Sequence, residues 1–160
     1  MSTTKFGTEV TLPSDTEIAM TRTFDAPAAL VWKAYTEPEL LRRWLLGPDG
    51  WEMPICEIDL RVGGKWRYGW ALPDGSQAFE MHGEYTEVVP HSRIANTEIF
   101  EDNPPARTVV EFVEEGGRTT MTTTMRLVSQ EARDAVLATG MADGAGRSYE
   151  RLGEVLATLS

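Results

Sequence analysis

Residues 59–70 read DLRVGGKWRYGW, and the fold can be built outward from this stretch. Two glycines come directly before three aromatic residues at alternate positions, Trp66, Tyr68 and Trp70. Because successive side chains of a β-strand point to opposite faces, this spacing predicts a strand that follows a turn and carries its rings on one face. Such rings either pack as ordinary core or line a space that a small molecule enters.

Further strands are predicted from Trp51 to Leu127. Pairs and triplets of Gly, Pro, Asp and Asn divide this segment, which predicts a meander of about six strands. The stretch from Thr16 to Phe24 alternates apolar and polar residues and predicts an earlier strand, so that one antiparallel sheet of about seven strands results. Period-two spacing assigns these residues to its inner face: Trp66, Tyr68, Trp70, Phe79, Met81, Gly83, Tyr85, Val110, Phe112, Met121, Thr123, Met125 and Leu127.

Two short helices are predicted after the first strand, and one long helix at the end of the chain. Residues 27–35 begin with a proline, which suits the first turn of a helix. Residues 36–39, Thr-Glu-Pro-Glu, have the pattern of a capping box, which predicts a second helix over about residues 36–44. After Ser129, a good N-cap, apolar residues at three- and four-residue spacing predict one long helix to about residue 159.

Length and charge limit the classes of protein. The 160 residues suit one domain, which we place at residues 16–160, after a flexible N-terminal tail over residues 1–15. A net charge of −10 repels phosphate backbones and anionic lipids, so neither nucleic acid nor a membrane is an expected partner. The single cysteine, Cys56, cannot form an internal disulfide, and the N-terminus has no apolar segment, so a cytoplasmic location is expected.

The chain carries a set of short motifs: Phe24-Asp25-Ala26-Pro27, Val31-Trp32-Lys33-Ala34, Thr36-Glu37-Pro38 with Leu41 and Trp44, residues 59–64, and Gly83-Glu84-Tyr85 with Pro90 and Arg93. Together they resemble the family named for the activator of the Hsp90 ATPase, in its small bacterial branch of the START-like (SRPBCC) group. The resemblance implies an α+β helix-grip fold of the START/Bet v 1-like kind, in which a curved antiparallel sheet wraps around a long C-terminal helix. Members commonly carry Gly-Trp in that helix, whereas this chain has Gly144-Ala145, which predicts an unusually roomy cavity.

The candidate ligand-binding residues come from the predicted inner face of the sheet and from the facing stripe of the last helix. They are Trp44, Trp66, Tyr68, Phe79, Met81, Tyr85, Glu98, Phe112, Met121, Thr123, Met141, Ala145 and Tyr149.

The orientation of Asn96 and Glu98 is open at this point. Both share the parity of Ile94 and so face inward, unless a bulge after Val88-Val89 turns them to solvent. If Glu98 is buried without a partner, desolvation would keep it partly neutral near pH 7, and it could then bind a ligand hydroxyl or amine.

No catalytic, metal or cofactor site is predicted. The two histidines do not form a convincing triad with Cys56 or a serine, because His82 has outward parity and His91 lies in a turn. The sequence also lacks the zinc, P-loop and dinucleotide-binding motifs.

Three functions remain open. Binding of a small apolar or aromatic molecule between the sheet and the last helix is favoured over catalysis, since Glu98 is the one candidate for a titratable group in the cavity. The first alternative is an enzyme, of the cyclase or hydrolase kind, that uses the same cavity for acid/base chemistry. The second is a cochaperone-like interaction module, as the family resemblance implies. Homodimerisation is also left open.

Overall fold

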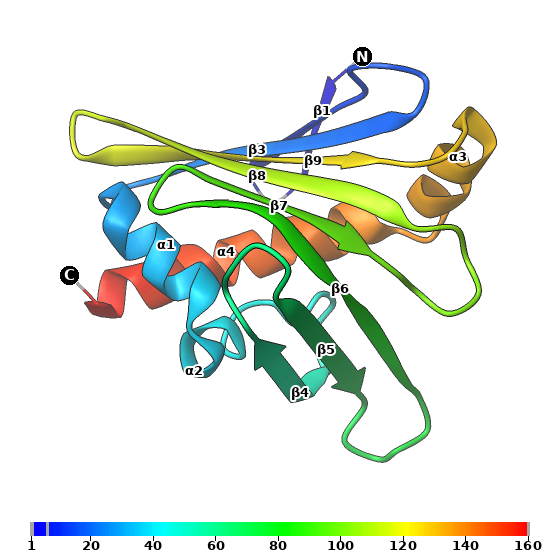
Figure 1. The fold of residues 1–160 in the computed structure, drawn as a ribbon. Coiled ribbons are helices and arrows are strands. Elements are labelled where there is room, and N and C mark those ends of the chain that lie inside the picture. The colour runs from blue at the N-terminus through cyan, green and yellow to red at the C-terminus, as the bar shows by residue number, and fades with distance from the viewer. Residues whose placement is uncertain (1, 6, 160) are drawn as a thin grey trace.

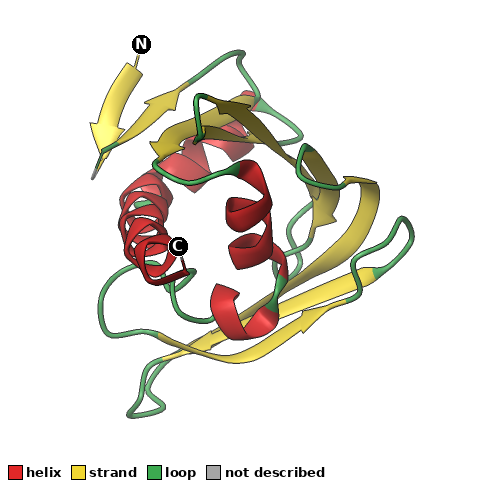
Figure 2. Cartoon of the chain, turned by 90° about the vertical axis from the view of Figure 1, so that its left-hand side faces the viewer, coloured by secondary structure: helices red, strands yellow, loops and turns green. Residues whose placement is uncertain are grey.

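The computed structural model describes residues 2–5 and 7–159, and it is built on one antiparallel sheet. The nine strands follow the order β1-β2-β3-β9-β8-β7-β6-β5-β4 (Figure 1). They curve around the helices, as the second view shows (Figure 2), and this arrangement confirms the predicted helix-grip fold. The strands are β1 (Ser2–Lys5), β2 (Thr8–Thr11), β3 (Glu17–Phe24), β4 (Glu52–Ile58), β5 (Lys65–Ala71), β6 (Ala78–Val89), β7 (Arg93–Glu98), β8 (Ala106–Glu115) and β9 (Arg118–Arg126). The helices are α1 (Ala28–Thr36), α2 (Pro38–Leu41), α3 (Gln130–Ala138) and α4 (Met141–Leu159).

The seven predicted strands correspond to β3 and to β4 through β9. The two additional strands, β1 and β2, form a hairpin that pairs with β3 through residues 9–11. Residues 2–5 and 8–11, which were predicted to belong to an N-terminal tail, are therefore strands of the sheet. Val10 is buried opposite Met20. One apolar residue in so short a segment does not make an alternating pattern from which a strand could be predicted. Of the remaining chain, Met1, Phe6 and Ser160 lie outside the described residues.

The predicted long C-terminal helix is in fact two helices. Ser129 does cap the first of them, because its Oγ accepts a hydrogen bond of 3.0 Å from the Ala132 amide. The helix then ends at Ala138, and Gly140 adopts a φ of +83°, a left-handed conformation that glycine reaches without a steric penalty. The predicted helix is therefore interrupted at Gly140, and α4 begins at the next residue.

The predicted capping box does not form. The Thr36 hydroxyl donates to the carbonyl of Trp32 within α1, and Glu37 is the residue that precedes α2. The helix starts with Pro38 and ends at Leu41, three residues before the predicted end. Because Thr36 still belongs to the first helix, its side chain bonds to the preceding turn.

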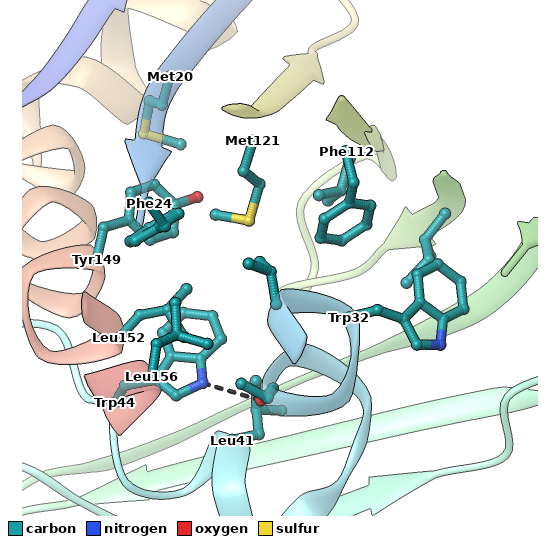
Figure 3. Close-up of a cluster of buried hydrophobic side chains, with 14 of the residues drawn as sticks. Met20, Phe24, Trp32, Leu41, Trp44, Phe112, Met121, Tyr149, Leu152 and Leu156 are labelled. Atoms are coloured by element: carbon teal, nitrogen blue, oxygen red, sulfur yellow. Dashed lines mark hydrogen bonds between the residues drawn. The ribbon is translucent and has the colours of Figure 1, made fainter. Parts of the chain in front are cut away.

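A solid apolar core fills the space between α1, α2, the sheet and the C-terminal half of α4 (Figure 3). Trp44 is completely buried there, and its indole nitrogen donates to the carbonyl of Ala34 at 3.0 Å. Phe112 packs edge-on against Trp32, with ring centroids 5.5 Å apart. Side chains fill the space between the sheet and α1, α2 and the C-terminal half of α4. Any internal cavity must therefore lie nearer α3.

Candidate functional site

A cavity of about 1090 Å³ lies between the inner face of the sheet and the helices α3 and α4. Strands β5 to β9 provide its floor, and the loop over residues 45–51 provides one wall. It is partly open to solvent, and exposed residues border it at the β5–β6 turn, the β7–β8 loop and the α3–α4 junction. Ligand pockets in proteins commonly have volumes of about 300–1,000 Å³, so a molecule of ordinary metabolite size has room here.

Most of the candidate residues from the sequence come together on this cavity. Ten of the thirteen line it: Trp66, Tyr68, Phe79, Met81, Tyr85, Glu98, Thr123, Met141, Ala145 and Tyr149. They come from four strands and one helix, as the period-two and helical spacing predicted.

Three candidates do not line the cavity and belong to the solid core instead. Trp44, Phe112 and Met121 are each at most 4% exposed, and their side chains belong to the apolar core next to α1 and α2. Phe112 and Met121 have the expected inward parity, but they lie nearer the α1 end of their strands, where α1 and α4 fill the space. Alternation identifies the face of a strand, and it does not tell where along that face the packing opens.

Several lining residues were not among the candidates. Leu46, Pro48 and Trp51 come from the loop after α2, and Tyr35 from the last turn of α1. The apolar side chains of this loop could have indicated that it is partly buried, because a loop on the surface seldom carries so many of them. Thr108 was also missed, although it shares the parity of the inward Val110.

The rings of the opening stretch do line the cavity, and they form one continuous aromatic wall. Trp66 and Tyr68 have ring centroids 4.7 Å apart, and Trp70 stacks on Phe79 at 5.0 Å. Phe79 in turn contacts Phe100 edge-on at 5.8 Å. Both indole nitrogens of this wall donate to backbone carbonyls, of Thr97 at 3.2 Å and of Leu45 at 2.7 Å. The wall therefore offers ring surface and no free indole donor.

The polar groups of the cavity are few and mostly neutral. Burial raises the pKa of Tyr35, Tyr68, Tyr85 and Tyr149, so all four hydroxyls stay protonated near neutral pH. The Tyr149 hydroxyl is 3.0 Å from the hydroxyl of Thr123. The hydroxyl of Thr108, in contrast, is buried and has no hydrogen-bond partner among the described residues.

Glu98 faces the cavity together with Asn96, which decides between the two orientations left open by the sequence. The register of β6 and β7 does shift, but between Tyr85 and Glu87, while Val88 still pairs with Ile94. Burial raises the pKa of Glu98 from 4.5 to about 7. In the part of the chain that the structure describes, its carboxylate has no hydrogen-bond or ion-pair partner.

This elevated pKa predicts that Glu98 destabilises the protein at alkaline pH. The folded state holds the proton more tightly than the unfolded state, so stability falls as pH rises from about 4.5 to about 7 and then levels off. The difference corresponds to about 3 kcal/mol. We therefore expect Glu98→Gln to raise the free energy of unfolding at pH 8 by up to about this amount, and to change it little at pH 4.5.

Urea denaturation between pH 4.5 and pH 8 measures this effect. The matched control is Glu84→Gln, which removes the same charge from an exposed position on β6. If the Glu98 variant and the wild type show parallel stability curves, then Glu98 is not a desolvated carboxylate.

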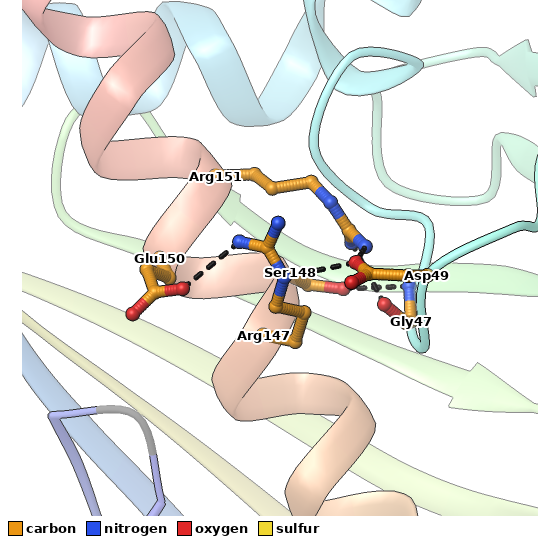
Figure 4. A network of polar contacts seen from close by, with 6 residues as sticks. All are labelled: Gly47, Asp49, Arg147, Ser148, Glu150 and Arg151. Carbon is orange, nitrogen blue, oxygen red and sulfur yellow. Dashed lines mark hydrogen bonds and ion pairs between the residues drawn. The ribbon is translucent and has the colours of Figure 1, made fainter.

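The loop that forms one cavity wall is fastened to α4 by polar contacts (Figure 4). Arg147 and Arg151 both donate to Asp49, at 2.9 and 2.7 Å, and these hydrogen bonds lower the pKa of that carboxyl. The amide of Gly47 donates to Ser148 at 2.8 Å, and its carbonyl accepts from Arg151 at 2.7 Å. These contacts fix the position of the loop wall against α4, which also lines the cavity.

Neither histidine contributes to the cavity. His82 is exposed on β6, and His91 lies in a turn with a positive φ, where its ring meets the edge of Trp32. Within residues 2–5 and 7–159, no three His, Cys, Asp or Glu side chains are grouped so that they could hold a metal ion. The helices of the same residues include none that is long and apolar enough to cross a membrane.

Residues 25–157 match the family model described as Activator of Hsp90 ATPase homolog 1-like protein, and the chain belongs to this family. A crystal structure of a Rhodobacter sphaeroides protein is similar, with 29% identity, a TM-score of 0.88, and coverage of 96% of this chain and 99% of that chain. A Mycobacterium smegmatis protein is 27% identical with a TM-score of 0.81, and all of both chains is covered. An AHSA1-like protein from Aeromonas hydrophila is 25% identical with a TM-score of 0.68, over 86% of this chain and 94% of that one. No curated protein matches the chain.

Proposed function

We propose that this protein binds a small apolar or aromatic molecule in the cavity between the sheet and the helices α3 and α4. The observation that carries the proposal is the cavity itself, about 1090 Å³ in volume and lined mainly by rings, methionines and small residues. A large apolar cavity with a few convergent polar groups is the arrangement that ligand sites usually have. The small side chain of Ala145 on α4 supports it, because a larger residue there would take up part of the cavity.

A neutral fluorescent probe tests this proposal. Dansylaminopentanol has an aromatic body and a hydroxyl tail, and its fluorescence rises in apolar surroundings. We expect it to bind the wild-type protein saturably, with one site per chain. A signal that increases without saturation, or that is equal for heat-denatured protein, would argue against a defined site.

Acid/base catalysis in the same cavity is a second candidate, and the pKa of Glu98 near neutrality is the observation that favours it. The test is to incubate a molecule that co-purifies with the protein with the wild type and with Glu98→Gln. Recovery of the molecule unchanged from both proteins supports binding alone. Conversion by the wild type and not by Glu98→Gln supports catalysis.

No such observation favours a chaperone-binding surface. The exposed large apolar side chains of the described residues come from separate elements. They are Leu12, Val62, Val89, Val113 and Val128.

A further inference from the structure

Glu98 is the single charged side chain among the described residues that line the cavity. No Lys, Arg or His lies on the same described surface, so the carboxylate faces a space that holds no counter-charge. The other titratable groups that face the cavity are Tyr35 from α1, Tyr68 from β5, Tyr85 from β6 and Tyr149 from α4. Their hydroxyls are neutral near pH 7, so they cannot compensate a negative charge.

The surroundings of Glu98 are also those that favour a cation. It lies on β7, the strand next to β6, and two residues beyond it Phe100 begins the aromatic wall that runs through Phe79 to Trp70. The faces of aromatic rings attract cations, most strongly where water is excluded. Glu98 and the rings of this wall line the same cavity, so one bound molecule can meet both the carboxylate and the aromatic surface.

We propose that the cavity selects an apolar or aromatic amine, whose protonated nitrogen pairs with the Glu98 carboxylate while its body lies against the aromatic wall. This proposal rests on the proposed binding function. An anion would be repelled by the carboxylate. A neutral alcohol could donate one hydrogen bond, but the buried negative charge would remain uncompensated. A cation neutralises the ionised carboxylate directly, and the net charge of −10 also attracts cations to the protein.

Two probes that differ in one group test the proposal. Dansylcadaverine carries a terminal ammonium where dansylaminopentanol carries a hydroxyl, and the two are otherwise alike. At pH 8 we expect wild-type protein to bind the amine about tenfold more tightly than the alcohol, or better, as is typical of a charge-assisted hydrogen bond.

The pH dependence provides a second readout on the unmodified protein. With a pKa of about 7, Glu98 is about nine-tenths ionised at pH 8 and about one-tenth ionised at pH 6. An alkylamine, like a Lys side chain, stays protonated throughout this range. Affinity for the amine should therefore fall about tenfold from pH 8 to pH 6, whereas affinity for the alcohol should stay nearly constant.

Two variants locate the effect. Glu98→Gln should lose the preference for the amine and keep the affinity for the alcohol, while Glu84→Gln, which removes an exposed charge, should behave as wild type. Circular dichroism shows whether each variant is folded. If Glu98→Gln does not fold, the pH dependence of amine binding by the wild type tests the proposal instead. Equal binding of both probes at pH 8, or a preference that survives in Glu98→Gln, overturns the amine proposal and leaves the binding function standing. If neither probe binds, the binding function itself is contradicted.

Discussion

Replacing Ala145 by Trp is expected to abolish binding of dansylaminopentanol while leaving the protein as stable as wild type, or more stable. Ala145 lies on the cavity side of α4, between Met141 and Tyr149, and the space in front of it is open. An indole placed there would bury roughly 150 Å² of apolar surface, which contributes up to about 4 kcal/mol before strain and entropy are subtracted. The same ring would occupy the volume that the probe needs.

Fluorescence titration and thermal denaturation together measure this prediction. Ala29→Trp is the control, because Ala29 is an exposed α1 residue that does not line the cavity. A clear fall in the melting temperature of Ala145→Trp would mean that the site is already packed, since an overfilled core loses about 1 to 3 kcal/mol. A stable variant with undiminished affinity would place the probe elsewhere.

Gly83→Ala is expected to destabilise the protein severely, by about 3 kcal/mol or more. A Cβ added at Gly83 would clash with the carbonyl oxygen of Thr97 and lie 2.7 Å from the indole nitrogen of Trp66. These two atoms are joined by the 3.2 Å hydrogen bond that crosses β6, so glycine is the residue that lets the indole reach the neighbouring strand. Relief of the clash would have to separate β6 from β7, because one of the atoms belongs to the backbone.

Gly153→Ala in α4 is the matched control for this substitution. Its added Cβ would meet only ordinary contacts, 3.8 Å from Arg22 and 4.0 Å from Phe24, and alanine is the better helix former by about 1 kcal/mol. Chemical denaturation should therefore move in opposite directions for the two variants. A Gly83→Ala protein as stable as wild type would show that the close crossing of Trp66 over β6 is not required.

The order of the elements from β3 to α3 could be predicted because most of them carry a local signal in the sequence. Alternation predicted β5, from Trp66 to Trp70, and the Ser129 cap predicted the start of α3. The break at Gly140 depends on a left-handed backbone conformation, and a glycine in a sequence does not by itself tell whether it takes one. The hairpin of β1 and β2 depends on pairing with β3, a contact that no local pattern records.

The cavity was predictable on the strands and much less so on the loops. Residues such as Tyr85 and Glu98 follow from the parity of their strands. Pro48 and Trp51 could not be placed in the same way, because the path of their loop is set by long-range contacts from Arg147 and Arg151 to Asp49. The cavity ends at Phe112 because Trp32 and Tyr35 of α1 pack against its ring. Period-two spacing cannot show such a contact.

Native mass spectrometry of the protein purified from its own organism tests the central claim most directly. If the cavity is a binding site, part of the protein should carry an additional small mass that is released on denaturation, and Ala145→Trp prepared in the same way should lack it. The released molecule should contain an apolar or aromatic body and a basic nitrogen. Protein found only at the mass of the chain, together with no binding of either dansyl probe, would contradict the account.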